Sequence, residues 1–154
     1  MQIHITKNVE ETMELAKKIA ENISKKTKGI TIFCLHGEMA AGKTHFSKGF
    51  AKGLGIIEDI TSPTFSIHNI YEYEFGTLHH FDFYRIDKEQ AMDLDLDEYF
   101  YEDKTIHLIE WSENIENLIP KNVIHVYIKK LSASEREVIV DENNEYIWNE
   151  ARSY

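Results

Sequence analysis

The strongest constraint in this sequence is the segment Gly37-Glu38-Met39-Ala40-Ala41-Gly42-Lys43-Thr44, which follows an apolar run. Its Gly-x-x-x-x-Gly-Lys-Thr spacing is that of a phosphate-binding loop. In such a loop, backbone N–H groups point inward around the phosphates, and small residues let the chain wrap closely. The lysine adds a positive charge, the threonine hydroxyl reaches Mg²⁺, and the following helix directs its positive end at the anion. The segment predicts a site for ATP with Mg²⁺, and the candidate binding residues are Glu38, Met39, Ala40, Ala41, Gly42, Lys43, Thr44 and His45.

The flanking sequence has the strand and the helix that such a loop requires. Residues 30–35 form a nearly continuous β-prone run, typical of a buried strand in a parallel sheet. After the loop, apolar residues recur at helical spacing until Gly55, a residue that commonly ends helices. These apolar residues are Phe46, Phe50, Ala51 and Leu54.

The rest of the chain predicts further helices and strands. Asn8 and Glu11 have the offset of a capping box, which predicts a helix over residues 9–22. Strands are expected over residues 65–70 and 77–82, around a turn at Gly76, and over residues 105–109. Residues 92–100 read as short helix or loop, and residues 122–128 and 136–140 as a C-terminal hairpin. This order of elements predicts an α/β fold with a mixed sheet.

Length and composition predict a single domain. The chain has 154 residues, of which 42% are apolar, so we expect one domain over residues 1–154. No stretch approaches the roughly 18 to 20 apolar residues of a membrane span, and the first residues lack the pattern of a signal peptide. We therefore expect a soluble, cytoplasmic protein. The single cysteine, Cys34, excludes an internal disulfide and is expected to fill space in a core strand.

The net charge of −10 argues against autonomous binding of nucleic acid. Neutralising backbone phosphates requires clustered Lys and Arg, whereas this chain has 27 acidic residues against 17 Lys and Arg. If nucleic acid is the end substrate, a partner protein is expected to hold it. The acidic segment 93–98 is typical of a solvated face, and docking on a basic partner surface is the alternative.

The preference for ATP over GTP is inferred from missing motifs. The sequence contains neither an Asn-Lys-x-Asp segment, which reads guanine, nor an Asp-x-x-Gly switch segment. A GTPase is therefore disfavoured.

A magnesium site needs a second anchor, usually a carboxylate at the end of a neighbouring buried strand. Glu110 ends the most apolar strand, where an acid is costly to bury unless a cation or hydrogen bonds receive it. We favour Glu110 as the Mg²⁺ ligand over a strand-end acid that faces water. Asp82 ends a strand in the same way and could orient the attacking water or contact Mg²⁺ through water, and the alternative is a turn-capping aspartate.

Other polar residues near these segments leave more than one interpretation open. The segment Thr61-Ser62-Pro63-Thr64 could sense the γ-phosphate or be a proline turn with capping hydroxyls. Arg85 could supply positive charge to the transferring phosphoryl group or form a surface ion pair. His79 and His80 are adjacent on a predicted strand and point to opposite faces, so we reject a shared metal ion.

Four segments together resemble the TsaE (YjeE) family of small bacterial ATPases. They are the loop, Ser62-Pro63-Thr64-Phe65, His80-Phe81-Asp82-Phe83-Tyr84-Arg85 and Leu108-Ile109-Glu110-Trp111. The similarity spans roughly residues 8–128. Members of this family are required for threonylcarbamoylation of the adenosine next to the anticodon in tRNAs that read ANN codons.

The resemblance implies a P-loop NTPase-like fold of three layers, with a mixed, mostly parallel sheet. It implies TsaD and TsaB as partner proteins, with tRNA reached indirectly. By motif, Lys43 and Thr44 would bind phosphate and Mg²⁺, and Glu110 would be the second Mg²⁺ ligand. Asp82, Lys43 and Thr64 would act in hydrolysis. Trp111 would border the nucleotide, and the turn at Asn8 would approach the adenine, although a helix cap explains Asn8 fully.

The chain departs from the family at Ala40, where a glycine is usual. If that position needs a positive φ, alanine costs about 1 kcal/mol. We expect slower turnover without loss of binding. We also expect slow intrinsic hydrolysis because no obvious second arginine lies near the loop.

Three functions are compatible with these observations. The first is an ATPase that resets a partner complex making modified tRNA. The second is a small-molecule kinase, which would need an acceptor pocket and an arginine-rich lid. The third is a nucleotide-gated binding module without catalysis.

Overall fold

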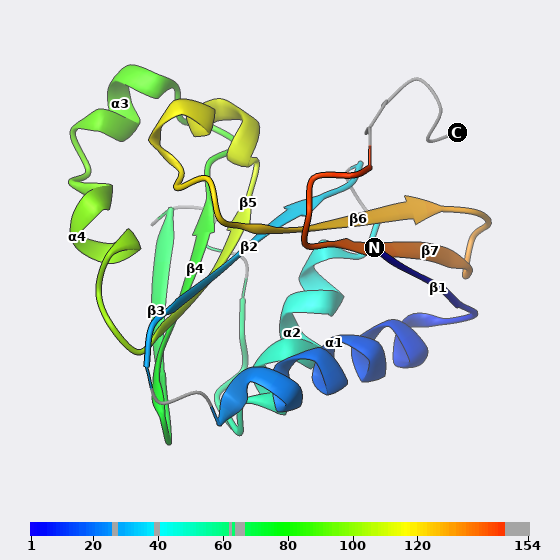
Figure 1. Ribbon diagram of the computed structural model, residues 1–154. Coiled ribbons are helices and arrows are strands. Elements are labelled where there is room, and N and C mark those ends of the chain that lie inside the picture. Colours follow the sequence, from blue (N-terminus) through cyan, green and yellow to red (C-terminus); the bar gives the residue numbers. More distant parts are fainter. Residues whose placement is uncertain (26–27, 39–40, 62, 64–66, 147–154) are drawn as a thin grey trace.

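The computed structural model describes residues 1–25, 28–38, 41–61, 63 and 67–146. These residues contain a sheet in the order β1-β7-β6-β2-β5-β4-β3 (Figure 1). Its strands are β1 (Gln2–Thr6), β2 (Ile30–His36), β3 (His68–Tyr73), β4 (Gly76–Asp82), β5 (Thr105–Glu110), β6 (Ile124–Lys130) and β7 (Arg136–Asp141). The helices are α1 (Val9–Ser24), α2 (Lys43–Gly53), α3 (Lys88–Met92) and α4 (Leu96–Phe100), and a 3₁₀ helix, η1, spans Ser112–Leu118.

The sheet is mixed, with a parallel centre. Strands β6, β2, β5 and β4 run parallel to one another, so their carboxyl ends lie at one edge of the sheet. Antiparallel strands flank this centre: β3 pairs with β4, and β7 pairs with β6 and β1. The predicted α/β fold with a mixed, mostly parallel sheet is confirmed, and so is the C-terminal hairpin, β6–β7.

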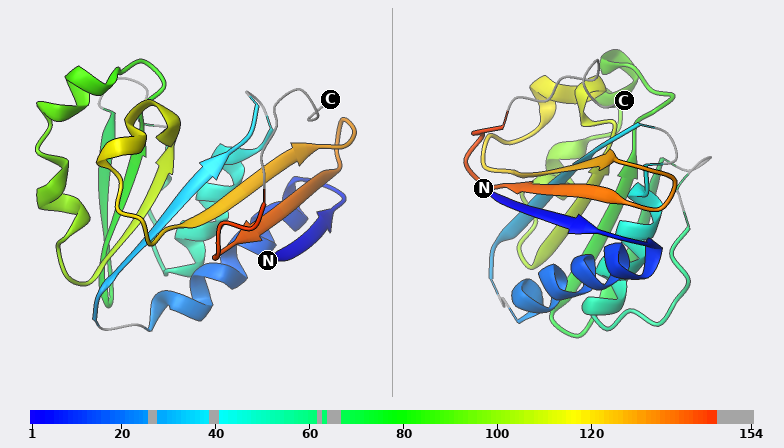
Figure 2. Two further views of the ribbon diagram at one scale, coloured as in Figure 1. Left: turned by 45° about the horizontal axis from the view of Figure 1, so that its top comes forward. Right: turned by 90° about the vertical axis from the view of Figure 1, so that its right-hand side faces the viewer.

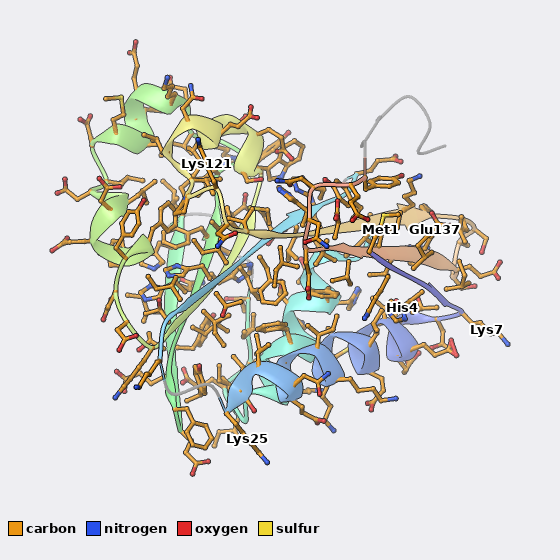
Figure 3. The ribbon with its side chains drawn as sticks, viewed as in Figure 1. Met1, His4, Lys7, Lys25, Lys121 and Glu137 are labelled. Carbon is orange, nitrogen blue, oxygen red and sulfur yellow. The ribbon has the colours of Figure 1, made fainter. Side chains whose placement is uncertain are left out.

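Helices cover both faces of the sheet and create two cores. Helices α1 and α2 lie on one face, and α3, α4 and η1 lie on the other (Figures 1 and 2). Strand β2 serves both cores by alternation: Phe33 and Leu35 pack toward α1 and α2, and Ile32 and Cys34 pack toward α3, α4 and η1. Side chains fill the space on both sides of the sheet (Figure 3).

Cys34 is a core residue, as expected. It is 1% exposed, and burial raises the pKa of its thiol to about 12. The thiol therefore stays protonated and unreactive at neutral pH.

Two elements were not predicted, β1 and η1. Strand β1 is an edge strand whose Ile3 and Ile5 remain more than half exposed. The paired residues of β1 and β7 lie 130 to 138 positions apart in the chain, so no local signal marks the pairing. Of residues 92–100, expected as short helix or loop, Leu96–Phe100 forms α4, whereas α3 lies before this stretch except for Met92. Residues 65 and 66 of the first predicted hairpin strand lie outside the described residues.

No helix in the described part of the chain is long and apolar enough to span a membrane.

Three histidines, one each from β3, β4 and β5, stack on the face of the sheet that α4 covers. His68 Nε2 lies 2.8 Å from His79 Nδ1, and the His79 ring stacks on His107 with 4.8 Å between centroids. Burial lowers the pKa of His68 and of His79 to about 4 and that of His107 to about 3. All three are therefore neutral at pH 7 and act as core aromatics.

This stack predicts acid sensitivity of the fold. A histidine whose pKa is lowered by folding stabilises the native state above its unfolded pKa near 6.5, and that stability is lost as the pH falls toward the folded value. Between pH 7.5 and pH 5, His79 alone should reduce the free energy of unfolding by about 2 kcal/mol. Urea unfolding at both pH values measures this loss.

His79→Asn is the informative variant because its amide nitrogen can replace Nδ1 toward His68 but does not titrate. It should flatten the dependence of stability on pH, whereas the same change at the exposed His45 should not. Equal slopes for wild type and His79→Asn would contradict this assignment.

Candidate nucleotide site

The register of the parallel strands brings two predicted acids to the same edge of the sheet. Asp82 of β4 pairs with Glu110 of β5, and Glu110 pairs with Leu35 of β2. The phosphate loop begins two residues after Leu35. In open α/β sheets, ligands bind outside the carboxyl ends of the strands. The loop and both acids therefore meet where a ligand is expected.

The described part of the loop has the close backbone approach that its glycines allow. A side chain at Gly37 would place its Cβ 2.9 Å from the carbonyl oxygen of Ile128 on β6. Gly42 has a φ of 114°, a conformation that favours glycine, and directly precedes α2. The amide of Ala41 donates to the carbonyl of Glu38 at 3.1 Å. Met39 and Ala40 lie outside the described residues, so the effect of Ala40 stays a prediction.

Lys43 begins α2 and is nearly buried. The residue is 8% exposed, and its Nζ lies 4.6 Å from the centroid of the Trp111 ring. Within the described residues it forms no ion pair. Lys43 interacts electrostatically with the Glu113 carboxylate without forming an ion pair. A buried ammonium group with so little compensation favours an anion. Trp111 contacts Lys43 and, with 4.9 Å between ring centroids, Tyr84, which the sequence did not single out.

Glu110 is buried and has a specific partner. It is 4% exposed, which rules out the alternative of a strand-end acid that faces water. Its Oε2 accepts a hydrogen bond from Nε2 of His80 on β4, at 2.8 Å, and His80 is fully buried. His80 is thus the partner that a buried acid needs, and the sequence analysis did not assign it this role. Thr44, half-buried at the second position of α2, is the other oxygen donor expected at a magnesium site.

Asp82 caps the turn after β4. Its Oδ1 accepts a hydrogen bond from the amide of Tyr84 at 3.0 Å, so the turn-capping alternative describes one of its contacts. Its own amide donates to the carbonyl of Ile67 at 2.8 Å. Ile67 in turn donates to the carbonyl of Pro63, so the described end of the proposed γ-phosphate loop lies beside Asp82. Ser62 and Thr64 themselves lie outside the described residues.

Asn8 is the N-cap of α1. Its side chain accepts a hydrogen bond from the amide of Glu11 at 2.8 Å, as the helix-cap interpretation predicts. The first turn of α1 and the phosphate loop share a cavity of about 80 Å³. Its lining includes Val9, Thr12, Gly42, His45 and Arg136.

The expectation that no second arginine lies near the loop is wrong. Arg136, at the start of β7, donates through Nε to the carbonyl of Ala41 at 2.7 Å. Its Nη1 donates to the carbonyls of Ser132 and Glu135 in the hairpin turn. No sequence signal marks this contact, because it joins residues 95 positions apart. Arg85 is exposed and pairs with no described acid.

The histidines on β4 behave as the alternation predicts. His79 faces the aromatic stack on one side of the sheet, and His80 faces Glu110 on the other. The rejection of a shared metal ion by this pair agrees with the structure. Among the described residues no group of three or more His, Cys, Asp or Glu side chains could hold a metal ion.

The strand, glycine-rich loop and helix, with acids aligned on the neighbouring strands, define a P-loop NTPase-like fold. The comparisons with known proteins specify the family. Residues 6–138 match the family model described as "Threonylcarbamoyl adenosine biosynthesis protein TsaE", and the chain belongs to this family.

Curated relatives cover most of the chain, and each is named tRNA threonylcarbamoyladenosine biosynthesis protein TsaE. The protein from Bacillus subtilis is 42% identical over 135 residues, which is 86% of this chain and 80% of the relative. The protein from Rickettsia prowazekii is 33% identical over 144 residues, which is 92% of this chain and 96% of the relative. The crystal structure of Bacillus subtilis YdiB superposes with a TM-score of 0.73 at 36% identity, covering 94% of this chain and 88% of that chain.

The buried pair of His80 and Glu110 gives a test of the site's architecture. His80→Phe should lower the free energy of unfolding by about 3 kcal/mol, because it leaves the buried carboxylate without its donor. His80→Gln should lose much less, since its amide nitrogen can replace Nε2. Urea unfolding of both variants decides this, and equal losses for the two would contradict the assigned role of the hydrogen bond.

Proposed function

We propose that this protein is a Mg²⁺-dependent ATPase that acts in tRNA threonylcarbamoyladenosine biosynthesis together with TsaB and TsaD proteins. The observation that carries the proposal is the convergence of Lys43, Glu110 and Asp82 at one edge of the sheet. Membership of the TsaE family supports the pathway. The adenosine next to the anticodon is the proposed site of modification, and the partners are proposed to hold the tRNA.

The residues fit ATP and magnesium. Hydroxyl and carboxylate oxygens are the ligands that Mg²⁺ prefers, and Thr44 and Glu110 supply one of each. Bound Mg²⁺ would neutralise charge on the phosphates. Lys43, close to an aromatic face and without an ion pair to a described residue, would exchange that face for phosphate oxygens. Trp111 is proposed to border the nucleotide. The further residues proposed to bind its phosphates are Glu38, Met39, Ala40, Ala41, Gly42 and His45.

Asp82 is proposed to orient the water that attacks the γ-phosphate. Its backbone is fixed by the register with Glu110 and by the hydrogen bond to Ile67, so its carboxylate lies at a defined height above the sheet. Thr64, which follows Pro63 in the sequence, is proposed to sense the γ-phosphate. The cavity between Val9 and the loop supports placing the adenine near Asn8.

One observation keeps a nucleotide-gated module without catalysis in consideration. The Asp82 carboxylate is already occupied in part by the amide of Tyr84. If that contact is its whole role, hydrolysis does not need Asp82.

Separate roles for Lys43 and Glu110 are expected in binding. Lys43→Ala should lower ATP affinity at least about 100-fold, because it removes a desolvated charge from the phosphates. Glu110→Ala should instead reduce the gain in affinity that Mg²⁺ gives. Isothermal calorimetry with and without Mg²⁺ measures both, and Lys48→Ala, on the same helix, is the matched control. Unchanged affinity in Lys43→Ala would refute the phosphate site.

Turnover is expected to depend on Asp82 and on partners. Asp82→Asn should keep ATP affinity but reduce hydrolysis at least about 100-fold, as for loss of a water-positioning group. Wild-type hydrolysis should be slow alone and should rise when TsaB and TsaD are added. A phosphate-release assay with each protein, beside an assay of tRNA modification, tests both. Full hydrolysis and modification by Asp82→Asn would favour the non-catalytic module.

A further inference from the structure

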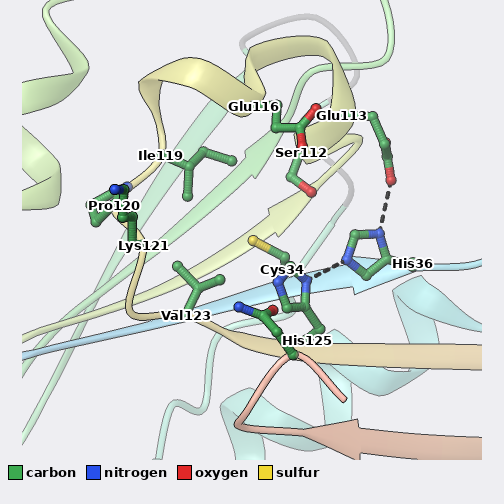
Figure 4. Close-up of a pocket in the computed structure, with 11 residues that line it drawn as sticks. Cys34, His36, Ser112, Glu113, Glu116, Ile119, Pro120, Lys121, Val123 and His125 are labelled. Atoms are coloured by element: carbon green, nitrogen blue, oxygen red, sulfur yellow. Dashed lines mark hydrogen bonds and ion pairs between the residues drawn. The ribbon is translucent and has the colours of Figure 1, made fainter. Parts of the chain in front are cut away.

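A cavity of about 530 Å³ lies on the face of the sheet covered by α3, α4 and η1, next to the phosphate loop (Figure 4). Its floor is formed by β2 and β6, through Cys34 and His125, and η1 forms one wall. Two glutamates of η1, Glu113 and Glu116, line the same cavity. The nucleotide site described above does not use these residues.

A chain of hydrogen bonds crosses this cavity. His36 Nδ1 lies 2.8 Å from Glu113 Oε1, and His36 Nε2 lies 2.8 Å from His125 Nδ1 (Figure 4). Because a carboxylate can only accept, His36 Nδ1 carries a proton and donates to Glu113. Burial alone would raise the pKa of Glu113, but the hydrogen bond and the charge of His36 hold it below its usual range. Glu113 is therefore an ionised acceptor at neutral pH.

His36 is held in place apart from this bond. It is 8% exposed, and its ring stacks on Tyr127 with 4.7 Å between centroids and 18° between planes. Glu113 is different, because its side chain is half exposed and depends on His36 for its described hydrogen bond. The histidine is thus the fixed member of the pair, and the glutamate is the member that it holds.

The pair joins two segments of the nucleotide site. His36 directly precedes Gly37, the first residue of the phosphate loop. Glu113 follows the turn that carries Glu110 and Trp111. Trp111 has a φ of 59°, a left-handed conformation that is costly for a residue with a side chain and persists only when its surroundings impose it.

We propose that His36 and Glu113 form a latch that positions the Trp111 turn against the phosphate loop. Glu113, anchored by His36, holds the strained turn from its carboxyl side, while β5 holds it from the other. This turn then keeps the Trp111 ring over Lys43. His36 is a positioning residue, and the part of this inference that concerns ATP rests on the proposed function.

The first test needs no nucleotide. The chain has two tryptophans, so Trp148→Phe leaves Trp111 as the sole tryptophan, which can be excited selectively over the tyrosines. In that background, Glu113→Ala should shift Trp111 emission to longer wavelength, because the released turn exposes the ring. Glu116→Ala is the matched control: it removes the same side chain from the same helix and cavity but breaks no bond to His36.

Two substitutions of His36 separate the latch from simple packing. His36→Asn places an amide nitrogen near Nδ1 and can keep the bond to Glu113. His36→Gln places it near Nε2 and can keep only the bond to His125. We expect His36→Asn to match wild type in Trp111 emission and His36→Gln to match Glu113→Ala. The reverse order would overturn the latch, and so would equal responses of the two alanine variants.

The second readout is the ATP dissociation constant by calorimetry. It should rise about tenfold in Glu113→Ala and His36→Gln, the effect of losing a hydrogen bond to a charged group, and stay near wild type in Glu116→Ala and His36→Asn. If wild type binds no ATP but the emission pattern holds, the proposed function fails and the latch stands. If wild type binds ATP and all four variants match it in affinity and emission, the latch fails and the function stands.

Discussion

The geometry of the proposed nucleotide site depends on the buried hydrogen bond between Glu110 and His80. An ionised carboxylate inside a sheet is stable only with a donor or a cation beside it, and His80 supplies the donor from the adjacent strand. Because β4 and β5 run parallel, the pairing that places His80 opposite Leu108 also places Asp82 opposite Glu110. One register thus sets the height of both acids. A one-residue slip of β4 would turn His80 and Asp82 toward the other core and leave Glu110 without its donor.

The two faces of the sheet have different parts in this arrangement. The face covered by α1 and α2 carries Glu110 and the phosphate-loop helix. Trp111 packs against the core on the opposite face, which also holds the hydrogen bonds of His36 and the aromatic stack of His79. Alternation along single strands connects them: Leu35 and His36 are neighbours in sequence and point to opposite faces.

The sequence predicted the parts of this molecule that local patterns determine. Strand β2, the loop and α2 follow from an apolar run, a glycine spacing and a helical period, and Glu110 follows from its place at the end of an apolar strand. The partners of these residues depend on pairing between distant segments, which local patterns do not encode. His80 as the donor to Glu110 requires the β4–β5 register, and β1 as a strand requires β7, which comes at the other end of the chain.

Arg136 shows why such distant contacts matter for the chemistry. The sequence led us to expect no second arginine at the loop, and from that to expect slow hydrolysis. The structure places Arg136 on the loop, but its Nε and Nη1 donate to backbone carbonyls of Ala41 and of the hairpin turn. A guanidinium held in this way fixes the loop to the C-terminal hairpin and has fewer donors left for a transferring phosphoryl group. The expectation of slow turnover by the protein alone thus keeps a physical basis, although its original reason was wrong.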